Sequence, residues 1–227
     1  PGNPVLQLIA RCFTMFTGPD KAAVMVNSMS AVCSALTIFF LYLTIVFLVK
    51  RVIVLKRDGE GGTGEYSLGQ AIAIYGSGAV GALAYCFSDT FWFSAVEGEV
   101  YAMSSLFTAM VVWAMTKWYE ETDRRYANRW IVLISFLMGL SIGVHLLNLL
   151  AIPKLVYMYY FKMREDKPYS FWEYVKILAV SVVILAFILF FMVPYIPKIA
   201  AYIDLFIVNT LGLPYNTGAA FFIVALL

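Results

Sequence analysis

Residues 130–161 read WIVLISFLMGLSIGVHLLNLLAIPKLVYMYYF, a long apolar run with few polar side chains. A transmembrane helix needs about 20 residues, so this run is too long for one span. Pro153 and the polar residues His145 and Asn148 interrupt it, and they indicate a break near residues 146–150. The stretch therefore predicts a helical hairpin made of two short spans.

The composition of the whole chain also indicates a membrane protein. Of its 227 residues, 62% are hydrophobic and only 13% are charged, whereas a soluble domain has about a quarter charged residues. We predict an all-α, polytopic transmembrane helical bundle with about six spans plus one truncated span. Nucleic acid is excluded as a partner, because no basic stripe gathers on one element. Besides the hairpin, the apolar runs cover residues 22–49, 68–87, 100–118, 172–194 and the segment from 217 onward.

Lysine and arginine residues predict the orientation of these spans. They gather in the connections at 50–67, 117–129 and 162–171, and the intervening connections are poor in them. Such residues favour the cytoplasmic side, and the alternation is consistent only if 130–161 is a hairpin. The chemically interesting side chains then share the extracytoplasmic side: Asp89, Glu97, Glu99, His145, Asn148, Lys198 and Asp204.

The two ends of the chain suggest how it is organised. Residues 4–17 are apolar with Gln7 and Arg11 on one helical face, which predicts an interfacial helix over 1–17 followed by a helical bundle over 18–227. The alternative is the tail of a helix that begins upstream. The first residue is not methionine, and the last run is cut off within apolar sequence. We therefore expect a fragment of a longer membrane protein that forms a single module over 1–227.

Two further patterns have structural explanations. The segment GSGAVG at 76–81 matches a dinucleotide-binding fingerprint, but that fingerprint requires a preceding strand. Here the glycines lie inside an apolar helix and predict close helix packing, as do Gly139 and Gly143. The three cysteines are far apart and lack metal-binding spacing, so we expect free thiols.

Glu97 and Glu99 open an apolar run in the stretch WFSAVEGEVYAMSSL. One interpretation places them in the first turn of a helix starting near residue 98, where the helix dipole stabilises a carboxylate. The other makes them acids of an outward-facing cleft, since ionisable groups in membranes usually face cavities and mark function. Residues two apart on a helix point to nearly opposite faces. We therefore expect Glu99, close to Tyr101, to face the cleft.

His145 and three further polar residues complete the candidate site. His145 shares a helical face with Asn148, and it either makes helix–helix hydrogen bonds or touches a phosphate or sugar in the cleft. Lys154 either extends to the membrane surface or meets an anionic lipid headgroup. Arg11 is an interfacial cation that could also neutralise a lipid phosphate. One histidine does not make a metal site, although acidic ligands alone could hold a divalent cation.

Three segments carry a family resemblance: PGNP at the start, FWFSAVEGEVYAMSSLFTA at 91–109, and RWIVLISFLMGLSIGVHLLNLLAIPKLVYMYYFK at 129–162. They resemble a bacterial membrane family grouped with the GT-C glycosyltransferases, one vertebrate relative of which is a protein O-mannosyltransferase. The usual family motif is His-Pro-Pro-Gly-x-Pro. Only Pro1, Gly2 and Pro4 of that motif are present here, and the first span and its acidic loop are absent.

The resemblance implies a GT-C-like module in a bacterial inner membrane, with an extracytoplasmic active face and a polyprenyl-phosphate sugar as donor. The acceptor would be a hydroxyl group, such as that of a protein. Mannose is one candidate for the sugar, whose identity the resemblance leaves open. The residues that the resemblance carries over are Glu99 and His145, as catalytic groups, and Asn148, in substrate binding. From the residue patterns described above we add Glu97, Tyr101, Lys154 and Arg11 to the substrate-binding set. The family's catalytic base would lie upstream, so this fragment alone would be inactive.

The chemistry of such a transfer is compatible with these residue types. An inverting transfer needs a carboxylate to take the acceptor's proton and a group that stabilises the departing lipid phosphate, such as a cation or a metal ion. A transporter is the rival interpretation, but its polar groups would lie near the bilayer midplane, often within a repeat. No repeat is evident here. A non-catalytic membrane scaffold is the second rival.

Overall fold

The computed structural model describes residues 3–59, 66–122, 125–164 and 170–226, with the side chains of 55–59 and 226 left out. Pro1 and Gly2 of the family motif, most of the connector at 58–65, and the basic residues Arg124 and Lys167 lie outside the described residues. The described chain is helical and forms two compact units, residues 1–163 and 164–227.

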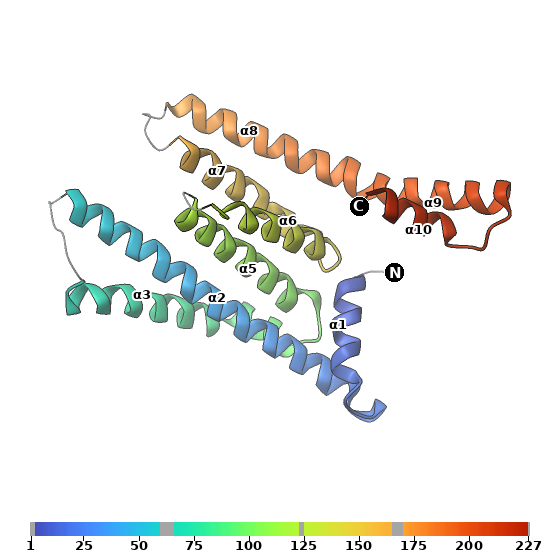
Figure 1. The fold of residues 1–227 in the computed structure, drawn as a ribbon. Coiled ribbons are helices and arrows are strands. Elements are labelled where there is room, and N and C mark those ends of the chain that lie inside the picture. The colour runs from blue at the N-terminus through green and yellow to red at the C-terminus, as the bar shows by residue number, and fades with distance from the viewer. Residues whose placement is uncertain (1–2, 60–65, 123–124, 165–169, 227) are drawn as a thin grey trace. The chain divides into compact units, whose positions relative to one another are not determined.

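The first unit is a helical bundle in which α2 and α5 each contact several other helices. Helix α2 packs on α3 and α5, and α5 also packs on α6, so these two helices form the centre of the unit (Figure 1). The elements of this unit are α1 (Pro4–Thr14), η1 (Pro19–Lys21), α2 (Ala22–Gly59), α3 (Leu68–Cys86), α4 (Asp89–Val96), α5 (Val100–Glu121), α6 (Asn128–Ile142), η2 (Leu146–Ala151) and α7 (Ile152–Met163).

The apolar run at 130–161 folds as the hairpin that its length predicts. Helix α6 ends at Ile142, the short 3₁₀ helix η2 follows, and α7 begins at Ile152. The chain reverses direction between α6 and α7 (Figure 1). Pro153 lies in the first turn of α7, where its missing N–H costs no hydrogen bond. The predicted break near 146–150 is therefore confirmed.

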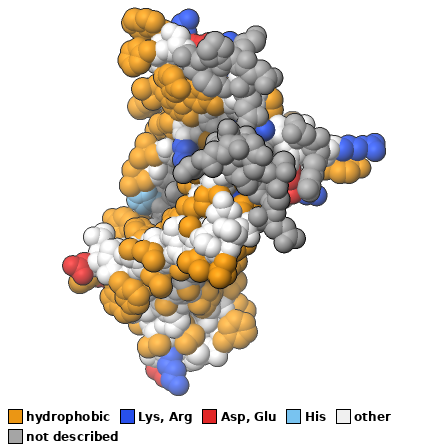
Figure 2. Space-filling view, turned by 90° about the vertical axis from the view of Figure 1, so that its left-hand side faces the viewer, with side chains coloured by type: hydrophobic (Ala, Val, Ile, Leu, Met, Phe, Trp, Pro, Cys, Tyr) orange, Lys and Arg blue, Asp and Glu red, His pale blue; other side chains and the backbone are white. Residues whose placement is uncertain are grey.

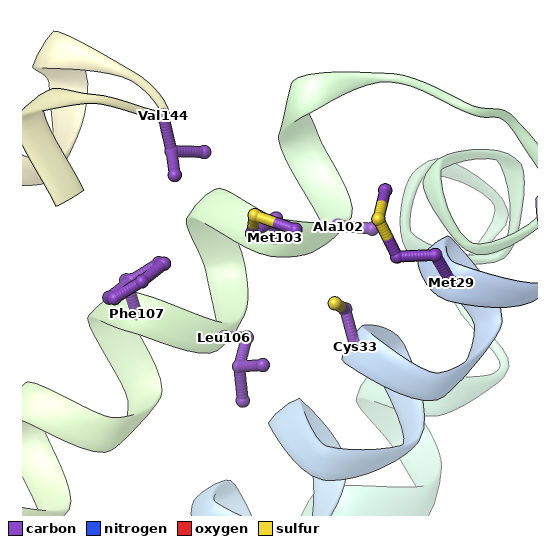
Figure 3. Packing of buried hydrophobic residues seen from close by; sticks show 7 residues of the cluster. All are labelled: Met29, Cys33, Ala102, Met103, Leu106, Phe107 and Val144. Atoms are coloured by element: carbon purple, nitrogen blue, oxygen red, sulfur yellow. The ribbon is translucent and has the colours of Figure 1, made fainter. Parts of the chain in front are cut away.

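The core of the first unit joins α2, α5 and the turn after α6. Met29 and Cys33 of α2 pack against buried residues of α5, and Val144 reaches the same cluster from the turn (Figure 3). Apolar residues of α1 cover this cluster, and the N–H of Val5 donates to the carbonyl oxygen of Gly143 at 3.1 Å. Helix α1 is therefore docked on the bundle by a backbone hydrogen bond as well as by its apolar face. The buried members from α5 are Ala102, Met103, Leu106 and Phe107.

The glycines in the 76–81 segment lie inside α3, as predicted, and two of them bring α3 against α2. A Cβ atom on Gly78 would lie 2.6 Å from Val46 Cγ2, and one on Gly81 would lie 2.8 Å from Ile45 Cδ1. Such distances are shorter than real Cβ contacts, so a larger residue at either position would force the facing side chains of α2 to move. Gly143 is equally crowded, but its neighbour is Val5 of α1, and a Cβ on Gly139 would meet nothing within 4 Å. The predicted close packing through Gly139 is therefore wrong.

The second unit contains one long helical run and a short final helix. Helix α8 (Phe171–Phe187), the π-helical segment η3 (Ile188–Met192) and α9 (Val193–Leu211) are continuous, and α10 (Thr217–Leu226) packs on α9. The sequence predicted an apolar span at 172–194, but the helix continues beyond it to Leu211. A proline removes an N–H and crowds the carbonyl four residues earlier. The π-helical turn lies directly before Pro194 and accommodates it there.

Asp204 has a structural role in the second unit. Its buried carboxylate accepts hydrogen bonds from the backbone N–H groups of Asn216, at 3.2 Å, and Gly218, at 2.8 Å. Gly218 approaches so closely that an added Cβ would lie 2.2 Å from the Cα of Asp204. Asp204 therefore caps the start of α10 and fixes it against α9.

Two helical segments among the described residues are long and apolar enough to cross a membrane: residues 19–54 and 171–211. A third span results if α3 and α4, which meet at a bend of 67°, count as one. Hydrophobic side chains also cover much of the described surface that Figure 2 shows. The structure thus supports a helical membrane protein with two to three candidate spans, and about six spans remains a prediction.

Candidate functional site

The link between α4 and α5 positions the two glutamates. Helix α4 ends at Val96 and α5 begins at Val100, so Glu97 and Glu99 lie in extended backbone rather than on a helix. A Cβ on Gly98 would lie 2.8 Å from Val26 Cγ1 and 3.0 Å from Asn27 Oδ1. Glycine therefore allows the link to lie against α2, and this contact fixes where the neighbouring carboxylates emerge.

Glu97 lines a cavity of about 630 Å³ between α3, α4 and α5, which we call the Glu97 cavity. Asp89, at the start of α4, contributes a second carboxylate, and Tyr101 contributes a phenol from the first turn of α5. Both carboxylate residues are exposed, so water can solvate their charge. The other lining residues are Tyr85, Thr90, Phe91, Phe93, Ser94 and Ser105.

Asn148, in contrast, is almost fully buried, with only 4% of its surface exposed. Its Oδ1 accepts hydrogen bonds from Ser104 Oγ at 2.5 Å and Thr108 Oγ1 at 3.1 Å, and both hydroxyls come from successive turns of α5. Its Nδ2 is buried without a hydrogen-bond partner. An unpaired buried amide donor costs about 1–3 kcal/mol, so this side chain is held in place with an unused donor.

That donor belongs to a residue lining a second cavity of about 620 Å³, which we call the Asn148 cavity. Lys154 of α7 lines the same cavity and adds a cation. Thr37 and Thr44 also line it, but their hydroxyls donate to backbone carbonyl oxygens of their own helix, at 2.8 and 2.9 Å. The remaining wall is largely apolar and includes Leu41, Ile45, Leu48, Val112 and Leu147. The cavity thus combines an amide donor and a cation with a long apolar surface.

The two cavities share part of their walls. Tyr85 of α3 and Ser105 of α5 line both of them. One side of this common wall carries the carboxylates of Asp89 and Glu97, and the other carries Asn148 and Lys154. An anionic group of a ligand could therefore lie beside Asn148 and Lys154 in one cavity. A hydroxyl group of a second ligand could lie near the carboxylate of Glu97 or Asp89 in the other.

His145 lies next to this site and contacts Tyr101. The two ring centroids are 5.9 Å apart. The imidazole Nδ1 accepts a hydrogen bond from the backbone N–H of Leu147 at 3.1 Å, which caps η2 and leaves the ring proton on Nε2. His145 is not among the residues that line either cavity. It is therefore placed to hold Tyr101 rather than to enter the cavities.

Two other residues expected at the site also lie outside both cavities. Glu99 is exposed at the N-cap of α5, and its side chain makes no capping hydrogen bond. Arg11 is exposed on α1. The cavities thus bring together Glu97, Tyr101, Asn148 and Lys154, and neither Glu99 nor Arg11 lines them.

Several lining residues were not singled out from the sequence. Asp89 was named only for its side of the membrane and was given no role in the site, yet it shares the cavity of Glu97. Ser104, Ser105 and Thr108 follow Tyr101, which the sequence analysis did name, at helical spacings of three, four and seven residues. This spacing places them on one face of α5. A polar stripe on an apolar helix is a signal that the sequence already contained.

The structure offers limited support for a metal site. Among the described residues, no group of three or more histidine, cysteine or acidic side chains lies close enough to hold a metal ion. Asp89 and Glu97 together supply two carboxylates to one cavity. The rest of that wall offers hydroxyl and aromatic groups, so the remaining oxygen ligands of a divalent cation would have to come from water or from a substrate phosphate.

Comparison with known proteins gives one match. Residues 1–168 match the family described as the protein O-mannosyl-transferase TMEM260 N-terminal domain. No curated protein and no solved structure matches the chain. The matched segment includes every residue that lines the Glu97 and Asn148 cavities. Because the match covers well over half of the sequence, the chain belongs to the TMEM260 N-terminal domain family.

Proposed function

We propose that this protein is a membrane glycosyltransferase that moves a sugar from a polyprenyl-phosphate donor to a hydroxyl group. The family's description names a protein O-mannosyl-transferase, which favours mannose as the sugar and a protein hydroxyl as the acceptor. The observation that carries the proposal is the pair of cavities with opposite chemistry on the two sides of Tyr85 and Ser105.

In this proposal the donor occupies the Asn148 cavity. The free Nδ2 of Asn148 donates to a phosphate oxygen, and Lys154 compensates the charge that grows as the sugar leaves. The apolar wall formed by residues such as Leu41 and Leu48 holds the first part of the lipid chain. Preorganised donors are effective in such a site because they need no rearrangement as the charge develops.

The acceptor occupies the Glu97 cavity. Inverting transfer requires the hydroxyl to attack from the side opposite the leaving phosphate, and a carboxylate orients that hydroxyl and accepts its proton. Glu97 and Asp89 supply carboxylates on that side. Glu97 thus takes the place in the cleft that the sequence suggested for Glu99. As the group that accepts the proton it replaces the upstream catalytic base that the family resemblance implied. His145 acts through Tyr101, as a positioning residue.

The lysine and arginine distribution supports an extracytoplasmic position for this site, in what we propose is a bacterial inner membrane. A polyprenyl-phosphate sugar is soluble in that bilayer, so the donor can reach the Asn148 cavity from the lipid phase. A protein acceptor can reach the Glu97 cavity from water, because its carboxylates are exposed.

The test uses the full-length protein in lipid nanodiscs. Radiolabelled polyprenyl-phosphate mannose and a peptide rich in serine and threonine are supplied, and GDP-mannose serves as the matched water-soluble donor. We expect label on the peptide only with the lipid-linked donor. If the folded protein transfers no sugar from polyprenyl-phosphate mannose, glucose or N-acetylglucosamine, the proposed function is wrong.

A further inference from the structure

The wall between the Glu97 cavity and the Asn148 cavity has a chemistry of its own. Among the described lining residues, two occur in both cavities: Tyr85 near the end of α3 and Ser105 in α5. Tyr85 exposes 43% of its surface, and Ser105 is half-buried. Both side chains are therefore accessible to a ligand that extends from one cavity into the other.

The hydroxyl of Ser105 differs from the other hydroxyls around the Asn148 cavity. Thr37 and Thr44 each donate to a backbone carbonyl oxygen four residues earlier, as helical threonines often do. Ser104 donates to Oδ1 of Asn148. Within the described part of the chain, Ser105 has no hydrogen-bond partner. Its hydroxyl is therefore available both to donate to a ligand and to accept from one.

Tyr85 is held in place while its phenol hydroxyl stays available. Its carbonyl oxygen accepts from the backbone N–H of Ser88 at 3.1 Å and from Ser88 Oγ at 2.8 Å. Its ring centroid lies 4.6 Å from that of Phe91. The phenol oxygen has no partner among the described residues. Tyr85 thus presents an apolar ring with a polar tip, which matches the C–H face and the hydroxyl rim of a sugar ring.

The geometry of the proposed transfer places the sugar at this wall. The acceptor oxygen forms a bond to the anomeric carbon, the bond from that carbon to the phosphate oxygen breaks, and its electron pair stays on the phosphate. The acceptor's proton passes to Glu97. The anomeric carbon must therefore lie between the phosphate and the acceptor. With the phosphate in the Asn148 cavity and the acceptor in the Glu97 cavity, the sugar lies beside the two shared residues.

We propose that Tyr85 and Ser105 form the sugar subsite and determine which hexose is transferred. The ring of Tyr85 stacks on one face of the hexopyranose, and the hydroxyl of Ser105 hydrogen-bonds one sugar hydroxyl group. A sugar with that hydroxyl missing or turned away leaves Ser105 unpaired and is transferred more slowly. This inference rests on the proposed function, and it adds the residues that contact the sugar itself.

The test of Ser105 uses the full-length protein in nanodiscs and the lipid-linked sugar that the wild type transfers best. Analogues of this donor each lack one sugar hydroxyl group. We expect kcat/KM of the wild type to fall by about tenfold for the analogue without the hydroxyl that faces Ser105. Ser105→Ala should lose about tenfold with the intact donor and nothing further with that analogue, because both changes remove the same hydrogen bond.

Ser28→Ala is the matched control for Ser105→Ala. Ser28 lines neither cavity, and its hydroxyl donates to the carbonyl oxygen of Val24 at 2.8 Å. This variant should respond to every analogue as the wild type does. If each analogue costs the wild type and Ser105→Ala the same factor, the subsite is wrong and the proposed function stands. If the folded wild type transfers no sugar from any donor, the proposed function and the subsite both fail.

Tyr85 is tested with the bare carrier, polyprenyl phosphate, as a competitor that occupies the Asn148 cavity without a sugar. Tyr85→Leu should lower kcat/KM for the donor by about tenfold and leave the inhibition constant of the bare carrier unchanged. Lys154→Gln should weaken the bare carrier instead. Tyr85→Phe keeps the ring beside Phe91 and should stay within about threefold of the wild type. If folded Tyr85→Leu weakens the donor and the bare carrier equally, Tyr85 contacts the lipid phosphate and not the sugar.

Discussion

The Asn148 cavity and the Glu97 cavity differ in how much free energy their polar groups cost the folded protein. Asn148 is buried, and its Nδ2 has no partner. Asp89 and Glu97 are exposed, so water can satisfy both carboxylates. An unsatisfied buried donor destabilises the fold, whereas a solvated carboxylate does not. The buried, unpaired Nδ2 therefore indicates a ligand in the Asn148 cavity more strongly than the exposed carboxylates indicate one in the Glu97 cavity.

The contrast also predicts how the two cavities respond to substitution. Groups that act on the leaving phosphate work in a partly dry environment, where one donor contributes strongly. Exposed carboxylates act in water and can substitute for one another. Substitutions in the Asn148 cavity should therefore reduce activity more than substitutions in the Glu97 cavity. The opposite order would contradict this difference between the two cavities.

The largest effect is expected for Asn148→Asp. The new carboxylate is the same size and still accepts from Ser104 and Thr108, but it replaces the free amide donor by a negative charge facing the phosphate. We expect sugar transfer to fall by about 10³-fold, measured as kcat/KM for the lipid-linked donor. Thr108→Val is the control, because it removes one hydrogen bond to Oδ1 and leaves Nδ2 in place. A variant that folds and keeps full activity would show that Nδ2 does not face the phosphate.

Lys154→Gln is expected to have the next largest effect. The variant keeps the length of most of the side chain and removes the cation from the Asn148 cavity. Loss of one charge that stabilises the departing phosphate should lower kcat by about 10²-fold. Lys154→Arg, which keeps the charge, should recover most of the activity. If Gln and Arg variants are equally active, Lys154 is a surface cation with no part in transfer.

A smaller effect is expected for Glu97→Gln, with Glu99→Gln as its matched control. Both changes remove one charge from the same link, but only Glu97 lines the cavity. We expect about a tenfold loss of kcat for Glu97→Gln, because Asp89 still supplies a carboxylate, and less than about twofold for Glu99→Gln. The reverse order would restore the role that the sequence suggested for Glu99.

The sequence predicted the helices better than it predicted the directions of side chains. The hairpin and the glycine contacts followed from apolar length and small residues, and both are properties of local sequence. The choice between Glu97 and Glu99 depended on a helix that would start near residue 98. The helix starts at Val100 instead, and the tertiary contact of Gly98 with α2 places the two carboxylates.

The surroundings of Asn148 are a second feature that the local sequence could not predict. The sequence analysis placed Asn148 on one helical face with His145, but α6 ends at Ile142 and η2 is a 3₁₀ helix. The hydroxyls that hold it come from α5, more than 35 residues away in the chain. Only the folded bundle shows that Oδ1 is satisfied while Nδ2 is not. Local pattern cannot indicate this, because it depends on which atoms of distant helices meet.

The smallest effect is expected for His145→Phe. The variant keeps an aromatic ring against Tyr101, but it loses the acceptor for the backbone N–H of Leu147. Such a ring contact contributes about 0.5–1.5 kcal/mol, so its retention should limit the loss of kcat to about threefold, with KM for the donor unchanged. His145→Ala removes the ring as well and should cost about tenfold. Rescue by phenylalanine distinguishes a positioning role from proton transfer, because a ring without nitrogen cannot carry a proton. If both variants lose activity equally and by more than 10²-fold, His145 acts on the substrate directly, and the two cavities would not contain the whole site.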